Sequence, residues 1–124
     1  ALAKGIERIL PELTGRLVAR AIRVPTLNVS LMDLTLSVAE STNIEQVNQA
    51  IKQASANLPA NVLGFTDEPL ASCDFNHGPR SASVDLNQTS VVNGKLIKLF
   101  VWFDNEWAYA NRMLDVAQYM SINT

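Results

Sequence analysis

Cysteine and histidine are nearly missing from this 124-residue chain, which contains one of each, Cys73 and His77. A single Cys cannot form a disulfide within the chain, which suits a reducing cytoplasm. One Cys and one His are also too few ligands for a metal site, so we expect none. The five glycines are scattered singly, and no G-x-G-x-x-G turn is present to bring backbone amides up to a pyrophosphate.

Charge and long apolar runs are also scarce. The formal net charge is -2 and the Lys and Arg residues are dispersed, which argues against a nucleic-acid partner. With 48% hydrophobic and 18% charged residues, the composition is typical of a globular domain and not of a disordered or membrane-spanning chain. Residues 1–13 carry charges between their apolar positions, unlike a signal peptide.

Hydrophobic periodicity predicts helices and strands in the first half of the chain. Leu2 to Leu13 has helical spacing, and strand character runs from Leu17 to Val24. Apolar and polar residues alternate from Met32 to Val38, which predicts a strand with one buried face. The residues Thr42 to Glu45 form a capping box, and a helical apolar stripe follows as far as Leu58.

The second half reads as strands followed by a closing helix. Short strands are expected at Val62–Phe65 and Ala71–Phe75. Asn93-Gly94 between apolar pairs predicts a two-residue hairpin. The run Leu96–Phe103 is apolar on both sides, so its sheet needs a cover beyond the chain's own helices. The fold class expected is α+β, a mixed, mostly antiparallel sheet with helices on one face.

The junction between the last strand and the closing helix carries the strongest functional signal. The apolar run stops at Asp104, Asn105 and Glu106, and a helical stripe follows. Asp and Asn are favoured helix N-caps, and Glu suits a first helical turn, so helix capping is one interpretation. Polar groups at the edge of a sheet can instead contact a ligand. The pattern alone leaves both interpretations open.

The residues at this junction, Trp102–Asp115 (WFDNEWAYANRMLD), resemble the last strand and C-terminal helix of the glyceraldehyde-3-phosphate dehydrogenase family. Further blocks are similar to the same family in the same order and with similar spacing. They are Ala3-Lys4 and ILPEL (Ile9–Leu13), RVPT (Arg23–Thr26) with NVS (Asn28–Ser30) and Asp33-Leu34, and SCDFN (Ser72–Asn76). The resemblance covers essentially all 124 residues and implies the family's C-terminal catalytic-domain fold.

The resemblance implies roles for two residues. Asn105 matches the family's Asn that contacts the nicotinamide of NAD, with Glu106 and Tyr109 as its support. Arg23 matches the Arg that helps to bind a substrate phosphate, a task that suits a planar guanidinium. From the residues alone, Arg20 and Arg23 lie on opposite faces of one strand and could equally pair with Asp or Glu.

The family's nucleophilic Cys, the His that activates it and the nucleotide-binding domain have no counterpart in residues 1–124. The chain therefore resembles the C-terminal part of the catalytic domain and is expected to be inactive alone. Cys73 is expected to be a buried structural thiol, and His77 a residue of a surface turn or a local hydrogen bond. Lys4 is expected at the surface, and Asp33 in a structural role.

Within the family, the chain is more similar to the erythrose-4-phosphate dehydrogenases. The likeness rests on Phe75-Asn76-His77 with Pro79, on Val84-Asp85 with Gln88-Thr89, and on Trp107 in the DNEW variant. It implies NAD-dependent oxidation of a phosphorylated aldose, D-erythrose 4-phosphate, to 4-phosphoerythronate for pyridoxal phosphate synthesis. The alternatives are phosphorylating oxidation of glyceraldehyde 3-phosphate and a non-enzymatic, self-associating domain.

The family resemblance also implies assembly. Members form homotetramers partly through the sheet of this domain, and the C-terminal helix is expected to pack against the nucleotide-binding domain. The expected two-faced apolar strands would make the chain self-associate.

Overall fold

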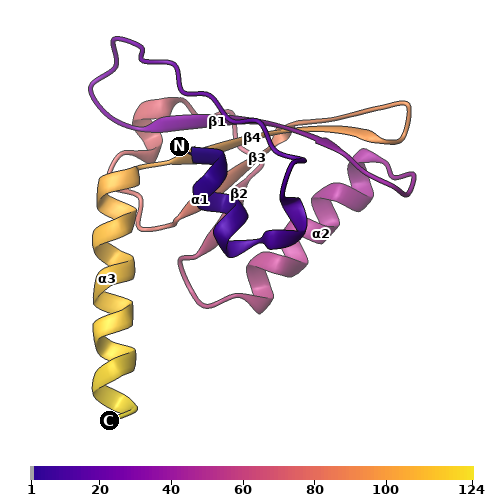
Figure 1. Ribbon diagram of the computed structural model, residues 1–124. Helices are drawn as coiled ribbons and strands as arrows, with labels where there is room; N and C mark the ends of the chain where they lie inside the picture. Colours follow the sequence, from indigo (N-terminus) through magenta and orange to yellow (C-terminus); the bar gives the residue numbers. More distant parts are fainter. Residues whose placement is uncertain (1) are drawn as a thin grey trace.

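The computed structural model describes residues 2–124 and contains one four-stranded sheet, with strand order β1-β4-β3-β2 (Figure 1). Strand β4 (Leu96–Phe103) pairs antiparallel with both β1 (Ser30–Ser37) and β3 (Ala82–Val92). Strand β2 (Leu63–Thr66) pairs with β3 in parallel. The sheet is thus mixed and mostly antiparallel, and the predicted α+β class is confirmed.

The hairpin between β3 and β4 forms at the predicted residues. Asn93 and Gly94 have φ angles of 51° and 70°, the left-handed values that a two-residue hairpin turn requires. The Lys95 N–H donates to the Val92 carbonyl at 3.2 Å and closes the turn. Asn and Gly adopt this conformation at low cost, so the local sequence fixes the register beside the turn, from Ser90 to Val92. Further along, the pairing of β3 with β4 shifts register between Ser90 and Asp85, which the turn does not determine.

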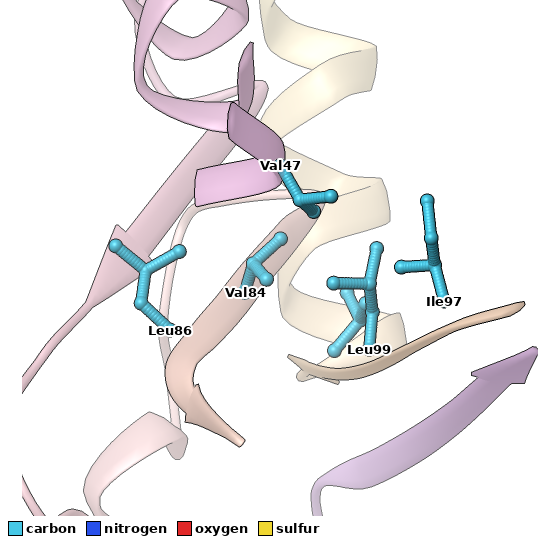
Figure 2. Close-up of a cluster of buried hydrophobic side chains, with 6 residues drawn as sticks. Val47, Val84, Leu86, Ile97 and Leu99 are labelled. Atoms are coloured by element: carbon cyan, nitrogen blue, oxygen red, sulfur yellow. The ribbon is translucent and has the colours of Figure 1, made fainter. Parts of the chain in front are cut away.

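Helix α2 (Ile44–Asn57) covers one face of the sheet, and the hydrophobic core lies between them (Figures 1 and 2). Val47 from α2 packs against side chains that alternate along β3 and β4. The buried cluster consists of Val47, Val84, Leu86, Ile97, Leu99 and Val101. The helix begins one residue later than a capping box at Thr42 predicts, because the Asn43 side chain is the cap and accepts the Gln46 N–H at 2.9 Å.

The second face of β4 differs from the expectation that this strand is apolar on both sides. Lys98, Phe100 and Trp102 point away from the core cluster and are partly buried. The Lys98 ammonium forms an ion pair with Asp33 of β1 at 2.9 Å, which gives Asp33 a structural role. Charged and aromatic residues therefore share this face. Self-association was expected because β4 would be apolar on both faces, and the presence of Lys98 and Asp33 weakens that expectation.

Residues 17–24 form no helix or strand, so the strand predicted there is wrong. Val18 and Ile22 are 84% and 87% exposed. A strand requires a neighbour for its N–H and C=O groups, and none of the four strands described in residues 2–124 pairs with this segment. The alternation of apolar residues in 17–24 therefore does not produce a strand, because no strand in residues 2–124 pairs with this segment.

The strand predicted at Ala71–Phe75 is also wrong, because Ser72–Phe75 forms a 3-10 helix, η2. The Asp74 carboxylate accepts the Ala71 N–H at 2.7 Å and closes a local turn. Phe75 then stacks on Trp102 with the ring centroids 5.4 Å apart. The hydrogen bond from the Ala71 N–H to the Asp74 side chain thus stabilises a local turn where the apolar residues predicted a strand.

The first helix is shorter than its apolar stripe. Helix α1 (Leu2–Ile9) ends before Pro11, and a 3-10 helix, η1 (Pro11–Leu13), follows. Proline removes a backbone donor and disfavours helical geometry in the residue before it, which explains the break.

Helix α3 (Asn105–Ile122) extends away from the sheet (Figure 1). Ala108 is its one buried residue, at 4% exposure. Its large apolar side chains are mostly exposed: Trp107, Tyr109, Met113, Leu114, Val116, Tyr119, Met120 and Ile122. Among residues 2–124, no helix is both long enough and apolar enough to span a membrane.

Candidate functional site

The site is centred on Asp104, the single residue between the end of β4 and the start of α3. Asp104 is 2% exposed, the most deeply buried polar side chain in the described part of the chain. Its carboxylate accepts the Trp107 N–H at 3.1 Å and so caps α3. Asp104 is therefore the cap of α3, and the side chain of Asn105 is not used for capping.

Two further segments donate to the same carboxylate. The Asn28 side-chain amide donates to Oδ2 at 2.7 Å, and the His77 backbone N–H donates to Oδ2 at 2.8 Å. The Asn28 amide also donates to Asn76 Oδ1 at 2.6 Å. Residues far apart in sequence thus meet at one side chain, and we call Asn28, Asn76, His77, Asp104 and Trp107 the Asp104 hub.

Hydrogen bonding keeps the Asp104 carboxylate ionised. Burial alone would raise its pKa, because a charge is less stable away from water. The N–H groups of His77 and Trp107 and the Asn28 amide outweigh that effect and hold the pKa of Asp104 below its ordinary value. A charged acceptor for several donors is thus stable at neutral pH.

The backbone on either side of the hub is unusual. Val29 and His77 have φ angles of 72° and 58°, in the left-handed region. A β-branched residue rarely adopts this conformation, and Val29 is buried at 8% exposure. Val29 thus combines a strained backbone conformation with burial, directly after Asn28, whose amide donates to Asp104.

Asn105 is the first residue of α3 and is exposed. Its position beside the hub gives it a fixed backbone and an exposed carboxamide, which can both donate and accept hydrogen bonds. Glu106 lies in the same first turn, and Tyr109 is 69% exposed. The support that Glu106 and Tyr109 give to Asn105 stays a prediction.

Arg23 lies in the irregular segment that leads to Asn28, and it is exposed. The placement of Arg20 and Arg23 on opposite strand faces is wrong, because no strand forms there. Neither Arg forms an ion pair within residues 2–124, where the ion pairs are Lys98–Asp33 and Arg112–Asp115. The guanidinium of Arg23 is therefore not occupied by an acidic side chain of the described chain.

The model of the family described as glyceraldehyde 3-phosphate dehydrogenase, C-terminal domain, matches residues 1–105. The chain belongs to this family. The match includes both the RVPT segment that contains Arg23 and the β4–α3 junction as far as Asn105.

In this dehydrogenase domain the only imidazole lies on an aromatic ring. The His77 ring stacks on the Trp107 indole with centroids 4.4 Å apart and planes at 27°. His77 is exposed and in a turn, as predicted, but the stack with Trp107 was not foreseen. Two of the features that resemble erythrose-4-phosphate dehydrogenases are thus in contact with each other.

Cys73 of the dehydrogenase domain is exposed on η2, so the prediction of a buried thiol is wrong. The error follows from the missing strand, because a residue of a short surface 3-10 helix is not enclosed by a sheet. Lys4 is exposed on α1, as expected. No group of three or more potential metal ligands occurs in residues 2–124.

A cavity of about 420 Å³ adjoins the hub, lined in part by Phe75, Arg80, Trp102 and Asp104. The Trp102 indole N–H is buried and has no hydrogen-bond partner among the described residues. Sequence reasoning missed this cavity and the hub. The sequence does show Asn28, Asn76 and Asp104 in segments that are polar or turn-like. These residues are far apart along the chain, so no local pattern predicts that their side chains meet.

Proposed function

We propose that this chain is the C-terminal part of the catalytic domain of an NAD-dependent dehydrogenase that oxidises a phosphorylated aldose. In this proposal Arg23 binds the substrate phosphate and Asn105 orients the nicotinamide. The observation that carries it is the Asn28–Asp104 hydrogen bond of 2.7 Å, which joins the segment after Arg23 to the residue before Asn105. This bond supports the proposal because it links the segment that contains Arg23 to the residue before Asn105.

The exposed groups fit these tasks. The Asn105 carboxamide is not used in capping, so it can pair with the carboxamide of a nicotinamide and fix its rotation. When bound, NAD supplies the hydride acceptor. The Arg23 guanidinium can form two parallel hydrogen bonds to a phosphate. The reactive Cys, its His and the nucleotide-binding domain are assigned to parts of the enzyme outside residues 1–124, and the chain alone is proposed to be inactive.

The proposed substrate is D-erythrose 4-phosphate, with 4-phosphoerythronate as product and pyridoxal phosphate synthesis as its use. Support comes from the contact between His77 and Trp107, two residues of the subfamily likeness. Phosphorylating oxidation of glyceraldehyde 3-phosphate is the alternative. Assays with each aldehyde, with and without the purified remainder of the enzyme that carries the reactive Cys, its His and the nucleotide-binding domain, test the substrate and the inactivity of the chain together.

We also propose a cytoplasmic homotetramer. The exposed apolar side chains of α3 support the assembly, because such a surface favours packing against another domain or subunit. The same surface is the observation that favours the non-enzymatic alternative, a domain that only self-associates. NADH formation by the reconstituted enzyme would contradict that alternative.

The phosphate role is tested by Arg23→Ala in the intact enzyme. Loss of one charge-assisted contact should lower kcat/KM for the phosphorylated aldehyde by about 10- to 100-fold, mainly through KM. The unphosphorylated aldehyde should be little affected. Arg20→Ala is the matched control, since Arg20 is an exposed Arg of the same segment. Equal losses with both aldehydes would make Arg23 a structural residue.

The nicotinamide role is tested by Asn105→Asp, which removes the amide donor and places a negative charge beside the ring. Hydride transfer should slow or NAD affinity should fall, while thermal stability stays almost unchanged because Asp104 is the cap. Gln118→Glu makes the same charge change on an exposed position of α3 and serves as the control. Unaltered turnover and NAD affinity in Asn105→Asp would contradict the assignment.

A further inference from the structure

The Asp104 carboxylate is more than a helix cap requires. The cap of α2 is Asn43, a neutral and exposed side chain that accepts one N–H. Asp104 is charged and 2% exposed, and burial of a charge is unfavourable unless several donors compensate for it. Here the donors come from three separate segments, so the carboxylate joins parts of the chain that a simple cap would not connect.

Helix α3 depends on such a junction for its direction. Ala108 is its one buried residue, so little of its side surface rests on the sheet. Away from its first turn, a tether is formed by Arg112, which donates to the Asn61 carbonyl and to Ser81 Oγ. Asn105 lies at the very start of the helix, next to Asp104, so its orientation is set mainly by the hub.

We infer that Asp104 is a positioning residue: its carboxylate locks the start of α3 against the turns at Asn28 and His77 and thereby orients the Asn105 carboxamide. The inference rests on the proposed function of Asn105 and adds a second residue to it. Asn28 contributes to the same junction, because its side-chain amide donates hydrogen bonds to both Asp104 and Asn76.

The decisive experiment is a double-mutant cycle in the intact enzyme with Asp104→Asn, Asn105→Ala and the pair. An Asn at position 104 still accepts the Trp107 N–H, but its amide opposes the donors of Asn28 and His77. We expect kcat to fall about 10- to 100-fold, as for misplacement of a reacting group, with KM for the phosphorylated aldehyde little changed. In the Asn105→Ala background the same change should cost less than about threefold, since nothing is left to orient.

The outcomes separate the two proposals. Additive losses in the cycle, or an unchanged kcat in Asp104→Asn, would overturn the positioning role. If Asn105→Ala itself leaves kcat unchanged, the nicotinamide role of Asn105 has failed, and the positioning role falls with it.

Asn28→Ala guards against simple misfolding, because it retains the carboxylate and the cap of α3 and changes an exposed residue. We expect a smaller, several-fold loss of kcat that is again not additive with Asn105→Ala. Full additivity in this cycle would also overturn the inference.

Amide hydrogen exchange on the chain supplies a readout that is independent of activity. In Asp104→Asn, the His77 amide should exchange about tenfold faster or more, with a smaller change at Trp107, whose acceptor is retained. Asn43→Ala, which removes the cap of α2, should leave both amides unaffected. Unchanged exchange at His77 in folded Asp104→Asn would contradict a lock at this position.

Discussion

Helices α2 and α3 differ in how they are attached to the same sheet. Helix α2 lies along one face and buries Val47 in the core cluster. Helix α3 extends from the end of β4, and residues along its length, such as Val116 and Leu114, are 57% and 70% exposed (Figure 1). One helix is therefore held by lateral packing, and the other is held mainly at its first turn.

Their caps differ in the same sense. Asn43 bonds one amide of its own helix, whereas Asp104 bonds amides from three segments. Two helices with similar local start signals thus have different tertiary roles. Where lateral packing is small, a buried polar junction supplies the specificity of placement, and that junction coincides with the candidate site.

The largest expected effect comes from removal of the buried junction. Asp104→Ala leaves three donors without their acceptor and should lower the free energy of unfolding of the chain by about 3 kcal/mol. Asn43→Ala, at the exposed cap of α2, should cost about 1 kcal/mol. Urea unfolding of both variants measures the difference, and equal costs would remove the distinction between the caps.

A smaller effect is expected from the same truncation on the two helices. Val47→Ala opens space in the core and should cost about 2 kcal/mol. Val116→Ala on α3 should change stability by no more than about 0.5 kcal/mol in the isolated chain. Thermal or urea unfolding reports both values. A cost at Val116 comparable to that at Val47 would show that α3 is covered in solution.

The smallest effect is expected from acid, because a protonated carboxyl can still accept hydrogen bonds. The folded pKa of Asp104 is lowered from 3.8, so its contribution is complete well above that value and is lost as the pH falls through the lowered pKa. Unfolding at stepwise lower pH should show this loss in wild type and in Asn43→Ala. The loss should be reduced in Asp104→Asn, and an identical pH profile there would assign the acid sensitivity to other carboxyls.

The sequence by itself determined the elements whose signals are local. The hairpin at Asn93-Gly94 forms because these two residues tolerate left-handed φ angles. The alternation of apolar and polar residues in Met32–Val38 produces β1. The helical stripe that contains Val47 and Ile51 produces α2. The sequence blocks that resemble the family identified Arg23 and Asn105 as candidate binding residues. The family model matches residues 1–105, which include both positions. Their binding roles remain predictions.

Only the tertiary structure decided which apolar segments become strands and what the polar junction does. Residues 17–24 have strand character but find no neighbouring strand, and Cys73 is exposed because its segment turns locally at Asp74. Asp104 reads as a cap in sequence, since its bond to Trp107 spans three residues. Its bonds to Asn28 and His77 span 76 and 27 residues, and contacts at such separations depend on how the chain folds back on itself, which local patterns do not encode.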